Sequence, residues 1–197
     1  ALDAAMPRGL RVEPSTLRYS YHEDEGLLKQ LGDKTLLKRE DGVVMFSSNY
    51  MPTMVRKFRA PADGLYRVRV SAYAYQSSKP VIMMAIGGDV VTGRGETHNI
   101  GYFDAPPGNP TVIEFTDRIS RNHTFKVMPF RLEGSERARQ TGADKYDGPG
   151  LAVQWVEIEG PLGSIVLKPG EKMIVTTQGL FFEEYIGSPL LSWTTRP

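Results

Sequence analysis

GLYRVRVSAYAYQSSKPVIMMAIGG, residues 64–88, is the stretch that decides the fold class. In its first half two sets of residues alternate, Tyr66, Val68, Val70, Ala72 and Ala74 against Arg67, Arg69, Ser71, Tyr73 and Tyr75. A two-residue period predicts a β-strand that buries its first set and turns the second set outward. Residues 76–80 then form a turn, and residues 81–86 are apolar at every position. This uninterrupted apolar run predicts a second, more deeply buried strand.

Short strand patterns continue on both sides of this stretch, separated by turns rich in Pro, Gly, Asp and Asn. We expect strands at residues 43–47, 55–59, 65–75, 81–86, 99–104, 111–119, 124–130 and 151–159. Many short strands with such turns are typical of a sandwich or jelly roll. We therefore predict an all-β jelly-roll β-sandwich over residues 41–160, with Trp155 in its core.

The flanking segments differ in pattern. Residues 1–40 read as an N-terminal extension, partly helical, with leucines spaced for short helical turns in residues 25–37. Residues 161–197 predict a C-terminal hairpin of 164–167 with 172–176, and an aromatic tail that packs on the sandwich. Residues 133–150 form a long polar loop, where function is more often found than core. Because the first residues resemble the end of a helix, we expect flanking domains of a larger parent chain.

The composition excludes several classes of function. The 197 residues carry 24 basic and 23 acidic side chains, a net charge of +1, which favours no nucleic-acid partner. The apolar runs are too short for membrane insertion. Cysteine is absent, which excludes disulfides, cysteine-bound zinc, iron–sulfur clusters and covalent haem in this chain. No hydrolase, P-loop or zinc-protease motif is present, and we predict that the chain is not an enzyme.

The outward face of the 65–75 strand is the main candidate binding site. Arg67, Arg69, Tyr73 and Tyr75 lie there, and Tyr146 lies in the polar loop. An aromatic ring packs against the apolar side of a sugar ring, while arginine can bond its hydroxyls. These residues predict a carbohydrate-binding site. The alternative is that the tyrosines cover a second layer of the fold or a neighbouring domain.

Asp144 and Asp147 are the candidate metal ligands, because they lie together in the polar loop beside a glycine. Ca²⁺ prefers oxygen ligands from carboxylates, carbonyls and water in a flexible shell. Two acids at this spacing are also common in ordinary turns, where they cap the backbone.

The order of these segments resembles carbohydrate-binding modules of families 6 and 36. The match rests on residues 64–89, on TVIEFTDRISRNHTFKVMPF (111–130) and on LAVQWVEIEG (151–160). REDGVVMFSSNYMPTMVRKFRAP (39–61) and the segments around it are also similar to a sandwich in large cytochrome-associated proteins of planctomycete bacteria. The planctomycete proteins carry a haem motif elsewhere, and this chain has none.

The resemblance implies a calcium-containing jelly roll that binds xylan or other polysaccharides, with Tyr146 and Asp147 in the loop that precedes the closing strand. We accordingly expect a lectin-like module that binds polysaccharide or oligosaccharide, in a periplasmic or extracellular bacterial protein. The rival interpretation is a structural spacer that packs against flanking domains and binds no free ligand.

Overall fold

The computed structural model describes residues 14–31, 34–48, 53–90, 95–132, 134–162, 172–176 and 179–183. The chain divides into two compact units, Ala1–Gly163 and Ser164–Pro197. In the second unit β10 (Lys172–Thr176) pairs antiparallel with β11 (Gly179–Glu183). Residues 164–167, the partner that we predicted for residues 172–176, lie outside the described residues. The aromatic tail 184–197 lies outside them too, and its packing stays a prediction.

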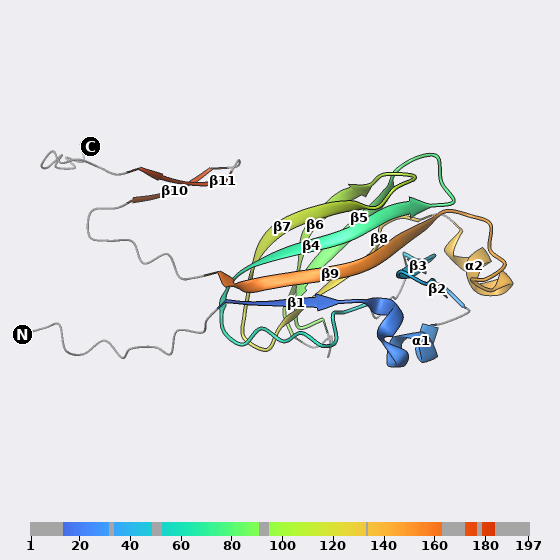
Figure 1. Cartoon of the computed structure of the whole chain (residues 1–197), viewed down its shortest axis with the longest axis horizontal. Helices are drawn as coiled ribbons and strands as arrows, with labels where there is room; N and C mark the ends of the chain where they lie inside the picture. Colours follow the sequence, from blue (N-terminus) through green and yellow to red (C-terminus); the bar gives the residue numbers. More distant parts are fainter. Residues whose placement is uncertain are drawn as a thin grey trace, which may run out of the picture. The chain divides into compact units, whose positions relative to one another are not determined.

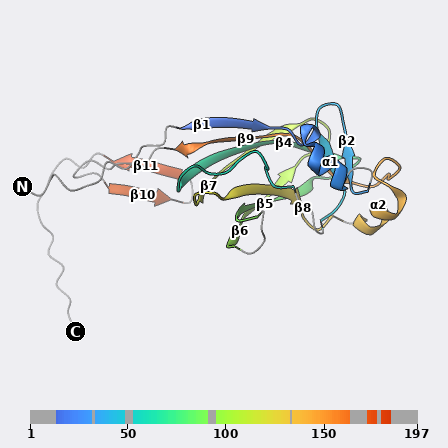
Figure 2. The same ribbon diagram turned by 90° about the horizontal axis from the view of Figure 1, so that it is seen from below.

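The first unit contains two antiparallel sheets that lie over one another (Figures 1 and 2). The six-stranded sheet has the order β2 (Leu36–Lys38), β3 (Val43–Met45), β9 (Gly150–Leu162), β4 (Gly64–Tyr75) and β7 (Thr111–Ile119), with β1 (Ser15–Tyr19) also paired to β9. The three-stranded sheet has the order β6 (Thr97–Ala105), β5 (Val81–Gly88) and β8 (Thr124–Pro129). The predicted all-β sandwich is confirmed.

The alternation in β4 has the expected consequence. Its inward set, Tyr66 to Ala74, is buried in a core shared by both sheets, while Arg67, Arg69, Tyr73 and Tyr75 are half-buried on the other face. Phe125 of β8 lies in this core, in contact with the rings of Phe58, Tyr66 and Phe115. Side chains from both sheets therefore meet in one apolar layer, which stabilises the sandwich.

The sandwich begins earlier in the chain than predicted. β1 pairs with β9, and it is followed by η1 (Tyr21–Glu23) and α1 (Glu25–Leu31). Tyr19, Tyr21 and Leu27 are buried in the main core, and the Tyr21 hydroxyl donates to the carbonyl of Thr53 at 2.7 Å. Residues 14–31 are thus part of the sandwich, because their aromatic and leucine side chains complete its apolar layer.

Two local predictions were wrong. Residues 55–59 are not a strand: Met54 makes a single bridge to Lys126, and the N–H of Phe58 turns back to the carbonyl of Val55. The polar loop of residues 133–150 contains a short helix, α2 (Ser135–Thr141), whose Ala138 is buried. Among the described residues no helix has the length and apolar character needed to cross a membrane.

The strand β5 is not buried on both faces. Val81, Met83 and Ala85 point into the core, but Ile82 is 37% exposed and Met84 and Ile86 are half-buried. A sandwich of two sheets covers only the inner face of each. The apolar residues on the outer face of β5 are therefore not part of the main core layer.

Two valines on the adjacent strands β4 and β7 test which face of the six-stranded sheet is buried. Val70 is fully buried, whereas Val112 on β7 is 52% exposed. We expect Val70→Ala to lower the free energy of unfolding by about 2 kcal/mol, because it removes buried methyl groups and leaves a cavity. Val112→Ala should change it by less than about 0.5 kcal/mol. Urea denaturation measures both, and equal losses would contradict the assigned faces.

Candidate functional site

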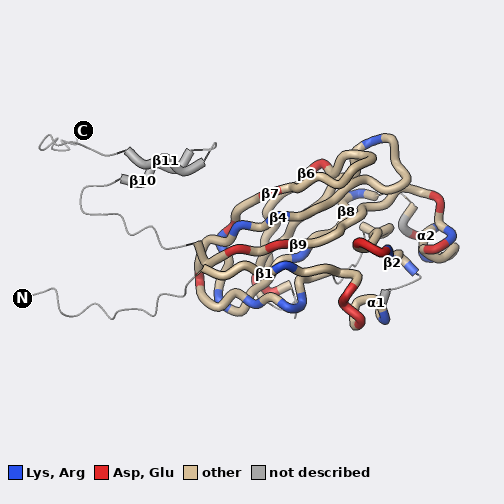
Figure 3. The backbone as a smooth tube through the Cα atoms, viewed as in Figure 1, with Lys and Arg blue, Asp and Glu red and all other residues tan. Residues whose placement is uncertain are grey.

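The outward side chains of β1, β9, β4 and β7 form one surface, here called the outer face. Acidic segments of β9 lie beside basic segments of β4 on this surface (Figure 3). Cross-strand pairing brings them together: Arg69 lies opposite Glu114 of β7 and Glu157 of β9, and Arg67 lies opposite Glu159. Opposite charges at directly facing positions attract one another across the sheet.

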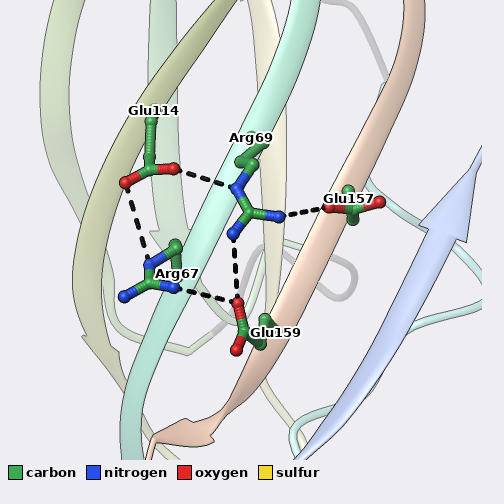
Figure 4. A network of polar contacts seen from close by, with 5 residues as sticks. All are labelled: Arg67, Arg69, Glu114, Glu157 and Glu159. Carbon is green, nitrogen blue, oxygen red and sulfur yellow. Dashed lines mark hydrogen bonds and ion pairs between the residues drawn. The ribbon is translucent and has the colours of Figure 1, made fainter.

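These five residues form an Arg–Glu network (Figure 4). The Arg69 guanidinium uses all three nitrogens, and its contacts are Nε to Glu114 at 2.9 Å, Nη1 to Glu157 at 2.6 Å and Nη2 to Glu159 at 3.3 Å. The Arg67 guanidinium contacts Glu159 at 3.2 Å and Glu114 at 3.7 Å. The network contains three carboxylates for two guanidiniums.

The hydrogen bonds that Arg69 donates to Glu114, and then to Glu157, raise the pKa of Arg69 above its ordinary value. Both arginines of the predicted site are thus held in place by carboxylates. The carboxylate oxygens around them can still accept hydrogen bonds from sugar hydroxyls, because each carboxylate has several acceptor positions. An anionic ligand, however, would meet the glutamates as well as the arginines.

Trp155 is on the outer face and not in the core, contrary to our prediction. Ser71 pairs with Trp155 but Ala72 pairs with Val153, so Gln154 is an extra residue, a β-bulge, in β9. The bulge shifts the alternation of β9 by one residue. Val156, after the bulge, is buried, and Trp155 is half-buried with the guanidinium of Arg18 3.9 Å from its ring centroid.

A row of linked polar groups lies beside Trp155. The Ser71 hydroxyl donates to Gln154 Oε1 at 2.7 Å, and Gln154 Nε2 donates to the Asp41 carboxylate at 2.5 Å. Each group is fixed by its neighbour. The row therefore presents an amide and a carboxylate in set orientations next to an aromatic ring.

The three predicted tyrosines lie at the other end of the outer face, where α2 covers the sheet. There a small cluster is formed by Val44, Phe46, Ala138, Ala143, Tyr146 and Ala152. Tyr73 and Tyr75 pack against it and are half-buried, and burial, followed by the charge of Asp41, raises the pKa of Tyr73. Tyr75 and Tyr146 meet the Phe46 ring edge-on, at interplanar angles of 65° and 80°. These rings do not form a coplanar platform.

Tyr146 is only 5% exposed, because its ring is enclosed by its own loop. A Cβ at Gly134, which has a φ of 84°, or at Gly148 would collide with the Tyr146 hydroxyl. Both positions therefore need glycine for the ring to fit. In this arrangement Tyr146 supports the small cluster and offers no open face to a ligand.

The two candidate metal ligands, Asp144 and Asp147, are both exposed. The Asp147 carboxylate accepts a hydrogen bond from Arg137 at 3.2 Å. In the described part of the chain no group of three or more His, Cys, Asp or Glu side chains is placed to hold one metal ion. Since calcium requires six or more oxygen ligands, this pair does not by itself fit a calcium site, and calcium binding here stays a prediction.

Comparisons with known proteins add a limited likeness. No family model matches the chain, and no curated protein matches it. Among solved structures, the chain is similar to the carbohydrate-binding module CBM6cm-2 of lichenase 5A from Cellvibrio mixtus, solved in complex with cellotriose. The identity is 16%, the match covers 76% of this chain and 91% of that chain, and the TM-score is 0.32. A function for this chain must therefore be argued from its own residues.

The structure thus brings Arg67 and Arg69 together, and separately Tyr73, Tyr75 and Tyr146. Sequence reasoning missed the residues between and around them, namely Trp155, Gln154, Glu114, Glu157 and Glu159. The alternation of Glu157 and Glu159 with buried residues could have placed them on a solvent face. The bulge that exposes Trp155 leaves no comparable signal in the sequence.

The Arg–Glu network allows a direct test of its energetic role. We expect Glu157→Gln to lower the melting temperature by at most about 3 °C, because half-exposed ion pairs contribute little to stability. The loss should disappear in 1 M NaCl, which screens such pairs. Glu136→Gln is the control, since Glu136 pairs with Arg139 on the exposed surface of α2, outside the network. A large, salt-independent loss would contradict this account.

Proposed function

We propose that this chain is a non-catalytic module that binds polysaccharide or oligosaccharide on the outer face, within a larger exported bacterial protein. The observation that carries the proposal is the position of Trp155 beside the linked groups Ser71, Gln154 and Asp41. An aromatic surface next to oriented hydrogen-bonding groups suits a sugar, whose ring has an apolar C–H side and a polar rim.

The proposed site runs from Trp155 toward the Arg–Glu network. Arg67 and Arg69 contribute as fixed polar groups, surrounded by carboxylate oxygens that accept hydrogen bonds from sugar hydroxyls. Tyr73 and Tyr75 border the site at its other end and keep part of their surface exposed. Because the face is open and shallow, we expect a dissociation constant of about 1 μM to 1 mM.

Arg18 must give way when a sugar packs on Trp155. Its guanidinium lies over the indole ring, but the side chain is exposed. A cation–π contact at an exposed site contributes only about 0.5–1 kcal/mol. Displacement of Arg18 is therefore a small cost that the sugar contact can offset.

The rival function, a spacer that docks flanking domains, is favoured by a different surface. Tyr102 is 51% exposed and Ile82 is 37% exposed on the outer face of the three-stranded sheet. Tyr102 contacts Phe130, with ring centroids 4.4 Å apart. Exposed apolar side chains that gather on one face are typical of interaction surfaces.

Two substitutions separate these functions. In affinity electrophoresis against plant, algal and bacterial polysaccharides, we expect Trp155→Ala to weaken sugar binding about tenfold, the loss of one stacking contact. Arg18→Ala should bind at least as tightly as the unaltered chain, because it uncovers the ring. The control is Tyr102→Ala on the other sheet, which should leave sugar binding unchanged. Failure of the unaltered chain to bind any polysaccharide would favour the spacer.

Calcium removal tests the remaining part of the resemblance. If Ca²⁺ binds the folded chain through Asp144 and Asp147, EDTA will lower the melting temperature and added Ca²⁺ will restore it, by mass action. The double variant Asp144→Asn/Asp147→Asn should melt at the EDTA value under both conditions. A melting curve that is the same with EDTA and with excess Ca²⁺ would remove the ion from the account.

A further inference from the structure

A group of basic side chains lies where the turn between β7 and β8 meets the segment before β4. We call Lys57, Arg59, Arg118 and Arg121 the basic patch, and all of them are exposed. The two parts of the chain are joined by backbone hydrogen bonds, from Ala60 N–H to the His123 carbonyl at 2.9 Å and from Asn122 N–H to the Ala60 carbonyl at 2.8 Å. Figure 3 shows blue segments along this lower edge of the sandwich.

Hydrogen bonds to its main chain hold the turn in one conformation, which fixes the backbone positions of its basic residues. The N–H of His123 donates to the Ser120 carbonyl at 3.0 Å, and Asn122 adopts a left-handed φ of 67°. Asparagine tolerates this conformation better than most residues. The Asp63 carboxylate accepts the N–H of Arg121 at 2.6 Å, so the acid anchors the backbone of the turn.

The charges of the basic patch are open to a ligand. Among the described residues no ion pair joins any of its four cations to an acidic side chain. One nitrogen of Arg59 donates to the Phe58 carbonyl at 2.6 Å, which leaves its other N–H groups available. Arg67 and Arg69 differ from these four residues, because their guanidiniums form ion pairs with glutamates.

We propose that the basic patch binds the carboxylate or sulfate groups of an acidic polysaccharide. Guanidinium groups match both anions with paired N–H donors. The inference rests on the proposed function for the identity of the ligand as a polysaccharide, but it concerns different residues, of which only Arg118 on β7 also lies on the outer face. The outer face, with more carboxylates than guanidiniums in its network, disfavours acidic groups, whereas the basic patch attracts them.

A nucleic acid is the other polymer that could supply anions. Proteins that bind single strands combine basic residues with exposed aromatic rings on which bases stack. The rings next to the basic patch, Phe58 and Tyr66, are 8% and 0% exposed. Neither ring is therefore free for a base, and the imidazole of His123 in the turn is half-buried. These neighbours offer no fully open aromatic face, so the patch fits anionic groups on a polymer that needs no stacking here.

The experiment measures affinity of the full chain for polygalacturonate, dextran sulfate and uncharged dextran at low and high NaCl. We expect one or both acidic polymers to bind and the affinity to fall with salt. Arg59→Gln/Arg121→Gln should weaken this binding about tenfold, as expected for the loss of two charge contacts. Lys57→Gln/Arg118→Gln, the other two exposed positions of the basic patch, should have a similar effect. Melting curves of all variants check that the fold is kept.

Arg137→Gln/Arg139→Gln is the matched control, because it removes the same charge from exposed positions on α2. An equal loss in this control would mean that net charge alone decides binding, and would overturn the proposal. So would failure to bind either acidic polymer, or equally tight binding of a DNA oligomer. Trp155→Ala should leave acidic-polymer binding unchanged. If the unaltered chain binds the acidic polymers but no neutral polysaccharide, that result would count against the proposed function and not against the basic patch.

Discussion

β4 pairs with β9 along one edge and with β7 along the other, and the rest of the first unit is arranged around it. Its inward side chains meet those of the three-stranded sheet, so a one-residue shift of register in β4 would move its buried set to solvent. The burial of this set, from Tyr66 to Ala74, fixes the register. Once the register is fixed, the positions of Arg67 and Arg69 opposite their glutamates follow.

The same constraint explains why the two ends of the outer face differ. At one end the outward residues of three neighbouring strands are charged, and they form ion pairs in solvent. At the other end Ala152 and Tyr73 are outward, and α2 with its following loop covers them. Between these ends the bulge at Gln154 places Trp155 on the surface. The candidate binding site thus begins at Trp155, between the covered end and the charged end, and runs toward the Arg–Glu network.

The charged side chains are unevenly distributed over the surface of this molecule. The chain is nearly neutral, which gave no reason to expect an anionic ligand. Yet Glu114, Glu157 and Glu159 surround Arg67 and Arg69, while among the described residues no ion pair joins an acidic side chain to a cation of the basic patch. Net charge averages over the whole surface, but a ligand responds to the charges within roughly 10 Å of it. For this reason an uneven distribution can create an anion-binding surface on a neutral protein.

The sequence by itself determined the all-β class, the position and faces of β4, and the outward placement of Arg67, Arg69, Tyr73 and Tyr75, because a two-residue period directly reports one buried face. It could not determine what lies on that face. The burial of Tyr146 depends on contacts with Phe46 and α2, which are distant in the chain or hidden in a polar segment. Large aromatic residues in strands usually pack in a core, but this expectation is wrong for Trp155 because a bulge reverses the alternation of β9 without a mark in the sequence. Only tertiary structure decides which partners neutralise an arginine or cover an aromatic ring, because those partners come from other strands.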